Sequence, residues 1–119
     1  MTKPLALIVE DDPHLGQIFS LTLQQDFDIE IITDGQSALN RLAEIIPAIV
    51  VLDVNLPNVS GNNILKQIRA DQRLKKTKVV IATGDSNQYS VLQNEADLVI
   101  LKPFSPLQLS ELVSRLHSR

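Results

Sequence analysis

Four acidic residues stand directly after two apolar stretches of the sequence. Glu10, Asp11 and Asp12 follow one stretch, and Asp53 follows another. Carboxylates brought to one place repel one another, so either the pKa of one of them rises or a cation is bound. Mg²⁺ suits such a group, because it binds one or two carboxylates, keeps some waters and leaves positions for phosphate oxygens. The acids therefore predict a magnesium site that can also handle phosphate.

Asp53 is the candidate nucleophile among these acids, because it is isolated in sequence from the other three. A carboxylate can accept a phosphoryl group directly, since aspartyl phosphate is a known type of covalent intermediate. The simpler interpretation is that the acids only cap helices. For Asp12 that interpretation is preferred, because Pro13 follows it like a first-turn proline. It is weaker for Glu10 and Asp11, and weakest for Asp53, after which no helix is expected to start at once.

A hydroxyl group and an ammonium group end two further apolar stretches. Thr83 is followed by Gly84, and Lys102 is followed by Pro103. An unpaired ammonium at the end of a buried strand is costly. This favours a carboxylate partner for Lys102 over a side chain that merely extends to the surface. Thr83 is either an ordinary strand end or a hydrogen-bond donor to phosphate, with Gly84 leaving room for an incoming molecule.

Strands and helices must bring these four positions together. Short apolar runs alternate with helical patterns along the chain, which is typical of parallel βαβ units. Most of the expected strands are continuously apolar, as strands covered on both faces are, and they comprise residues 5–9, 29–32, 48–52, 79–82 and 98–101. In an open α/β sheet, ligands bind beyond the carboxyl ends of the strands. The acids, the hydroxyl and the ammonium are therefore expected to meet at one edge of the sheet.

Helical periodicity lies between the expected strands. Apolar side chains three and four residues apart mark the first three helices, at Leu15, Ile18, Phe19 and Thr22, then at Ala38, Leu39, Leu42 and Ile46, and then at Ile64, Leu65 and Ile68. The last helix is the best defined, because Ser105 can cap it, Pro106 suits its first turn and Gln108 completes a capping box. A fourth helix over residues 87–95 is short and poorly patterned. The pattern predicts a doubly wound (βα)5 fold with helices on both faces of a five-stranded parallel sheet.

Composition excludes several classes of function. Residues 1–119 fit a single domain. The formal net charge of -3 gives no reason to expect nucleic-acid or membrane binding, which need a basic patch. The chain has no cysteine, which excludes disulfides, thiol catalysis and cysteine-bound metals. With neither a signal-peptide pattern nor an apolar run long enough to span a membrane, the expected location is cytoplasmic.

The motifs together resemble the receiver domains of two-component response regulators, over nearly the whole chain. The matching stretches are LIVEDD at 7–12, LDVNLP at 52–57, Gly61, the TG of IATGDS at 81–86, and KPF at 102–104. The resemblance implies a flavodoxin-like sheet with strand order 2-1-3-4-5, which is known from a member of this family. It also implies a phosphoacceptor switch in a phosphorelay, which is no enzyme beyond catalysing its own phosphorylation and dephosphorylation.

The same resemblance assigns the acceptor and the metal ligands. Asp53 would take a phosphoryl group from a phosphohistidine on a sensor histidine kinase or a histidine phosphotransfer protein. Asp11, Asp53 and the backbone carbonyl of Asn55 would bind Mg²⁺, and Glu10 would assist through water. The output partner is unknown from sequence. An exposed face on the last helix is a common dimer surface in the family, so a homodimer is compatible with the sequence but not required by it.

The remaining assignments concern the phosphate and the switch. Thr83 and Lys102 would hold the phosphate oxygens, and the Lys102–Pro103 peptide would be cis. Two features depart from the family pattern. Val99 stands three residues before the lysine, where the family usually has an aromatic residue, and the stretch from Thr83 to Lys102 is shorter than the family norm. These departures predict a short or irregular fourth helix and a different readout of the switch.

Two other functions share part of this pattern. A small aspartate-nucleophile phosphatase has acids, a hydroxyl and a lysine in this chain order. It also needs a second carboxylate two residues after the nucleophile, where this chain has Asn55. A degenerate receiver would be a phosphorylation-independent protein-binding module. Val99 and the short fourth helix favour that alternative, whereas the intact acids, Thr83 and Lys102 argue against it.

Overall fold

A computed structural model of the chain describes residues 3–56, 59–85, 87, 92, 95–102 and 105–118. Within these residues, five parallel strands form one sheet in the order β2-β1-β3-β4-β5. The strands are β1 (Leu5–Val9), β2 (Asp28–Ile32), β3 (Ile49–Asp53), β4 (Lys78–Thr83) and β5 (Leu98–Leu101). The predicted doubly wound class and strand order are confirmed.

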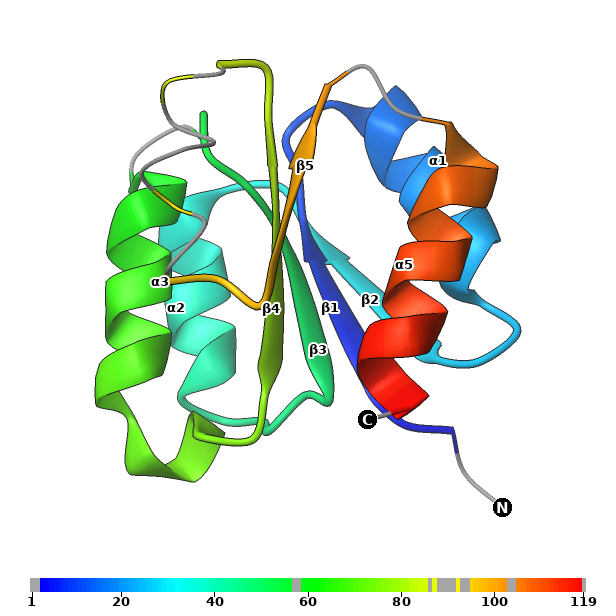
Figure 1. Ribbon diagram of the computed structural model, residues 1–119. Coiled ribbons are helices and arrows are strands. Elements are labelled where there is room, and N and C mark those ends of the chain that lie inside the picture. Colours follow the sequence, from blue (N-terminus) through cyan, green and yellow to red (C-terminus); the bar gives the residue numbers. More distant parts are fainter. Residues whose placement is uncertain are drawn as a thin grey trace.

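Helices cover both faces of this sheet (Figure 1). α1 (Pro13–Leu23) and α5 (Pro106–Ser118) lie on one face, and α2 (Gly35–Leu42) and α3 (Gly61–Ala70) lie on the other. A short 3-10 turn, η1 (Gln72–Leu74), leads from α3 toward β4. Most of the predicted fourth helix over residues 87–95 lies outside the described residues, and so does Pro103 of the predicted cis peptide at Lys102–Pro103. None of the helices in the described part of the chain has the length and apolar character that crossing a membrane requires.

The two helical layers explain why the strands are continuously apolar. Successive side chains of a strand point to opposite faces of the sheet. In β3, Val50 and Leu52 therefore belong to the core beneath α2 and α3, which includes Ile64. Ile49 and Val51 belong to the opposite core, which includes side chains of α1 and α5. All four of these β3 residues are at most 1% exposed.

The helix ends follow the predicted capping signals where the structure describes them. The side chain of Asp12 accepts a hydrogen bond from the amide of His14 at 2.9 Å, so Asp12 caps α1 as the preferred interpretation had it. Ser105 likewise accepts from the amide of Gln108 at 3.0 Å, at the start of α5. These caps fix where both helices begin, next to the carboxyl edge of the sheet.

One predicted helical position is wrong. Ile46 was expected on the apolar face of the second helix, but α2 ends at Leu42 and Ile46 is 61% exposed. Pro47 follows Ile46, and a residue that precedes proline is disfavoured in helical conformation. The chain therefore leaves the helix before Ile46 and turns toward β3.

Candidate functional site

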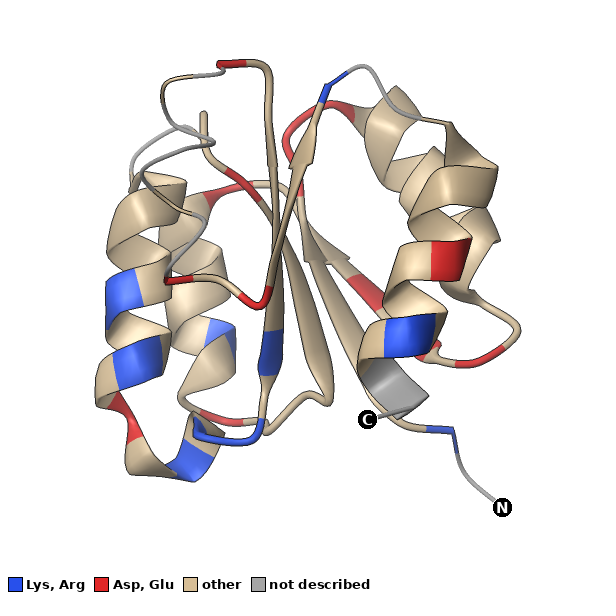
Figure 2. Cartoon of the chain, viewed as in Figure 1, with Lys and Arg blue, Asp and Glu red and all other residues tan. Residues whose placement is uncertain are grey.

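The register of the sheet aligns the carboxyl ends of β1 and β3. Val9 pairs with Leu52, so the residues that follow, Glu10 and Asp53, come level with each other. Figure 2 shows acidic segments where β1 and β3 end, facing the basic segment at the end of β5. The arrangement follows from parallel pairing alone, because parallel strands end at the same edge of a sheet.

Three carboxylates meet at this edge. Glu10, Asp11 and Asp53 each offer an oxygen, and these oxygens lie within 4.8 Å of one another. Glu10 is 1% exposed and Asp53 is 5% exposed, whereas Asp11 is open to solvent. Asp12 lies outside this group because it caps α1. One exposed and two buried carboxylates make a site that an ion or a phosphate can reach from one side.

Lys102 supplies the opposite charge to the two buried acids. Its Nζ lies 3.4 Å from Oδ1 of Asp53 and 3.6 Å from Oε1 of Glu10. The ammonium is held there because the amide of Lys102 donates to the carbonyl of Thr83 at 2.7 Å, which continues the pairing of β5 with β4. A buried carboxylate pair needs such compensation. Lys102 therefore balances charge at the site, as an ammonium at the end of a buried strand was expected to do.

The pKa of Glu10 is strongly raised. Burial, and next to it the neighbouring Asp53, raise the pKa of Glu10 from 4.5 to about 7, although the amide of Asp12 and the charge of Lys102 act in the opposite direction. Oε1 of Glu10 is buried and accepts no hydrogen bond from the described residues. A buried acceptor without a donor costs free energy. The chemistry of this donor set, with three carboxylates and one buried oxygen that has an ion-pair contact but accepts no hydrogen bond, fits a hard divalent cation.

The raised pKa of Glu10 makes the metal-free protein sensitive to pH. The folded state keeps the Glu10 proton up to about pH 7, whereas the unfolded state loses it near the ordinary value of 4.5. Glu10 therefore destabilises the fold progressively as the pH rises through this window, by a few kcal/mol at most, since one pKa unit corresponds to about 1.4 kcal/mol. Urea unfolding in EDTA should show Glu10→Gln gaining stability over the wild type between pH 4.5 and 7. If the difference in unfolding free energy between Glu10→Gln and the wild type stayed constant across these pH values, the raised pKa would not belong to Glu10.

Thr83 and Asn55 lie at the rim of the acid cluster. Thr83 is buried, and its hydroxyl oxygen accepts the amide of Asp85 at 3.1 Å. Asn55 is exposed, and its backbone amide donates to Oδ1 of Asp53 at 3.2 Å. A Cβ added to Gly84 would meet nothing within 4 Å, which agrees with the open space expected beside Thr83. The structure thus brings all of the predicted site residues to one edge of the sheet.

The role of Gly61 was not found from the sequence, although Gly61 belongs to the motif. A Cβ at Gly61 would lie 2.4 Å from the carbonyl oxygen of Asp53 and 2.8 Å from Cα of Val54. The amide of Gly61 also donates to the carbonyl of Val54 at 3.1 Å. Glycine therefore lets α3 begin directly against the backbone of the candidate nucleophile. The contact spans a loop, so no local pattern could have revealed it.

The domain is a doubly wound α/β fold with an acid cluster, a buried threonine and a lysine at the carboxyl edge of its sheet. These groups suit the binding of a cation and a phosphate. Comparison with known families narrows the class of protein, because residues 6–114 match the model of the response regulator receiver domain. The chain belongs to this family. It is a receiver domain of two-component signal transduction.

Individual relatives agree with this assignment. The chain is 33% identical, over 95% of its length, to the DNA-binding response regulator MtrA of Mycolicibacterium smegmatis, and it covers 49% of that protein. Among solved structures, the BeF3-activated receiver domain of DrrB has a TM-score of 0.87 and 32% identity, with 99% of this chain and 100% of that chain covered. A structure of DrrB from Thermotoga maritima also has a TM-score of 0.87, at 33% identity, with all of this chain and 54% of that one covered. The chain thus spans about half the length of its curated relative MtrA.

Proposed function

We propose that Asp53 accepts a phosphoryl group from a phosphohistidine when Mg²⁺ is bound, and that the modified domain switches a downstream partner. Residues 1–119 would act as one receiver domain and as a switch rather than an enzyme. The observation that carries the proposal is the position of Asp53. Its carboxylate lies within the acid cluster and 3.4 Å from the Lys102 ammonium.

Asp11, Asp53 and the backbone carbonyl of Asn55 would hold the metal, with Glu10 assisting through water. The clustered carboxylate oxygens support this ligand set, and so does the buried Oε1 of Glu10, which accepts no hydrogen bond from the described residues. When bound, Mg²⁺ would offset the negative charge of the carboxylates and of the phosphoryl oxygens, which otherwise repel one another.

The reaction itself is a phosphoryl transfer. A carboxylate oxygen of Asp53 forms a bond to phosphorus while the bond from phosphorus to the histidine nitrogen breaks. The electron pair stays on that nitrogen, which takes up a proton from solvent if the ring needs one. The Lys102 ammonium faces the reacting carboxylate and balances its charge, and the Thr83 hydroxyl would donate to a phosphoryl oxygen. Positioning and electrostatics do most of the work in such transfers.

The partners follow from the family. The phosphoryl donor would be a sensor histidine kinase or a histidine phosphotransfer protein. A relative from Dictyostelium discoideum, described as hybrid signal transduction histidine kinase D, contains a segment that is 28% identical to this chain. The presence of such a segment within a histidine kinase supports the proposal that a histidine kinase is the phosphoryl donor. The output would be another protein or domain, or a second copy through α5. With a net charge of -3, we propose that this domain contacts neither nucleic acid nor membrane itself and acts in the cytoplasm.

Incubation with acetyl phosphate tests the proposal. We expect intact-mass spectrometry to show one added phosphate in the presence of Mg²⁺ and none in EDTA, because the carboxylates repel a phosphate dianion unless a cation offsets their charge. Beryllofluoride, a stable mimic of the phosphoryl group, should bind under the same conditions. If neither the phosphate adduct nor beryllofluoride binding is observed, the domain is a phosphorylation-independent binding module and the proposal is wrong.

A further inference from the structure

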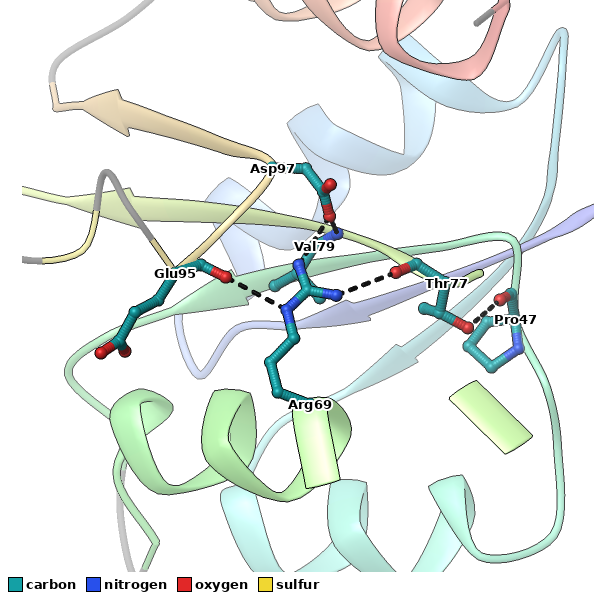
Figure 3. Close-up of polar contacts among 6 residues, drawn as sticks. All are labelled: Pro47, Arg69, Thr77, Val79, Glu95 and Asp97. Atoms are coloured by element: carbon teal, nitrogen blue, oxygen red, sulfur yellow. Dashed lines mark hydrogen bonds and ion pairs between the residues drawn. The ribbon is translucent and has the colours of Figure 1, made fainter. Parts of the chain in front are cut away.

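Arg69, near the end of α3, contacts three groups that lie at the start of β4 and β5 (Figure 3). Its Nε donates to the carbonyl of Glu95 at 3.1 Å, its Nη1 to the carbonyl of Thr77 at 3.5 Å, and its Nη2 to Oδ2 of Asp97 at 2.7 Å. A guanidinium suits this arrangement because it presents several donors in a rigid plane. Arg69 therefore ties α3 to the segment from which β5 starts.

Asp97 in turn fixes the start of β5 against β4. Its Oδ2 accepts the amide of Val79 at 2.7 Å, and its own amide donates to the carbonyl of Val79 at 3.0 Å. Both backbone polar groups of Val79 are thus bound by one residue, immediately before the paired positions Val80 and Leu98. The pairing of the two strands begins from this point.

The register of β5 decides where Lys102 lies. β5 has four residues and pairs only with β4, since it is an edge strand of the sheet. A short edge strand has few pairing bonds of its own, and a slip by one residue would send its side chains to the opposite face. At the far end of the strand, Leu101 pairs with Thr83 and the amide of Lys102 donates to the Thr83 carbonyl.

We propose that Arg69 is a positioning residue for phosphorylation. Through Asp97 it holds the register of β5, and the register places the Lys102 ammonium beside Asp53. Within the described residues, the hydrogen bonds of Arg69 go to Glu95, Thr77 and Asp97, and its role is separate from the proposed metal ligands at the ends of β1 and β3. This inference rests on the proposed phosphorylation of Asp53.

Arg69→Ala should slow phosphate uptake from acetyl phosphate about tenfold, since a small displacement of a charged group that faces the reacting atoms has effects of this size or larger. Mg²⁺ should bind the variant at least as tightly as the wild type, because the acids stay in place and a nearby ammonium moves away. Damage that is merely structural would weaken Mg²⁺ binding as well. Weakened Mg²⁺ binding or a wild-type rate in Arg69→Ala would therefore overturn the proposal.

A double-mutant cycle isolates the route through Lys102. Lys102→Ala alone should slow the reaction, and adding Arg69→Ala should slow it no further, because the group that Arg69 positions is gone. If Arg69→Ala slows phosphate uptake by the same factor in the Lys102→Ala background as in the wild type, Arg69 acts through another group.

Arg73→Ala is the matched control. Arg73 also donates to a backbone carbonyl, that of Leu42 at 2.7 Å, and pairs with Asp71 at 3.0 Å. Both of these contacts lie away from β5, so this variant should keep the wild-type rate of phosphate uptake. A loss as large as that in Arg69→Ala would mean that any weakened arginine contact suffices, and would overturn the proposal.

Hydrogen exchange of the Lys102 amide provides a readout that needs no phosphate. The exchange rate should rise in Arg69→Ala and stay at the wild-type value in Arg73→Ala, because the amide is held only while β5 keeps its register. If the wild type takes up no phosphate, the proposed function fails, whereas this measurement still decides whether Arg69 holds β5. Unchanged exchange in Arg69→Ala would refute the positioning role.

Discussion

The Asp53→Asn variant is expected to gain no phosphate from acetyl phosphate at any Mg²⁺ concentration. The substitution keeps the shape of the side chain but replaces the nucleophilic carboxylate oxygen with an amide. Asp53 is also one of three carboxylates within 4.8 Å of one another, so its loss should weaken Mg²⁺ binding at the same time. Intact-mass spectrometry measures the phosphate, and titration calorimetry measures the metal.

Asp12→Asn is the matched control for this variant. Asp12 is adjacent in sequence to the acid cluster but caps α1 through the amide of His14, and asparagine caps helices about as well as aspartate does. The control should take up phosphate at the wild-type rate. If Asp53→Asn still gained one phosphate, another residue would be the acceptor and the assignment of Asp53 would be wrong.

The Gly61→Ala variant is expected to lose about 3 kcal/mol of unfolding free energy, at the upper end of what added methyl groups cost in packed regions. The new Cβ would lie 2.4 Å from the carbonyl oxygen of Asp53, and that neighbour is backbone, which cannot rotate away as a side chain can. Either α3 or the end of β3 must move. Urea unfolding gives the free energy, and slower phosphate uptake would show that the displacement reaches Asp53.

Gly16→Ala offers the corresponding control within α1. A Cβ at Gly16 would lie 3.6 Å from Cγ2 of Ile31, which is ordinary van der Waals contact. Alanine is preferred over glycine inside a helix by about 1 kcal/mol, so this variant should be as stable as the wild type or more so. Equal stability of the two alanine variants would contradict the close approach of α3 to Asp53.

Short-range patterns were enough to predict most of the fold. The bounds of β1 and β5 were predicted as observed, because apolar runs flanked by polar residues define buried strands without reference to the rest of the chain. The meeting of Glu10, Asp53, Thr83 and Lys102 also follows from sequence, since parallel strands bring their carboxyl ends to one edge. Predicting the site therefore needed only the ends of the strands and the rule for where such sheets bind ligands.

Contacts between distant segments could not be predicted in the same way. The approach of Gly61 to Asp53 depends on how the intervening loop folds back, and the link from Arg69 to Asp97 joins residues on different elements. The wrong placement of Ile46 has a local cause instead. Ile46 has helical spacing, but it precedes Pro47, and a residue before proline is disfavoured in helical conformation.

The two ends of α3 are each tied to a different part of the sheet. Gly61 abuts the backbone of Asp53, and Arg69, eight residues later by number, reaches Asp97, which directly precedes β5. Eight residues of helix span about 12 Å, and each added residue turns the helix by about 100°. A helix one residue longer would therefore carry the guanidinium away from Asp97 while Gly61 stayed at Asp53. The length of this helix is a fixed dimension of the domain, set by the distance between its two attachment points.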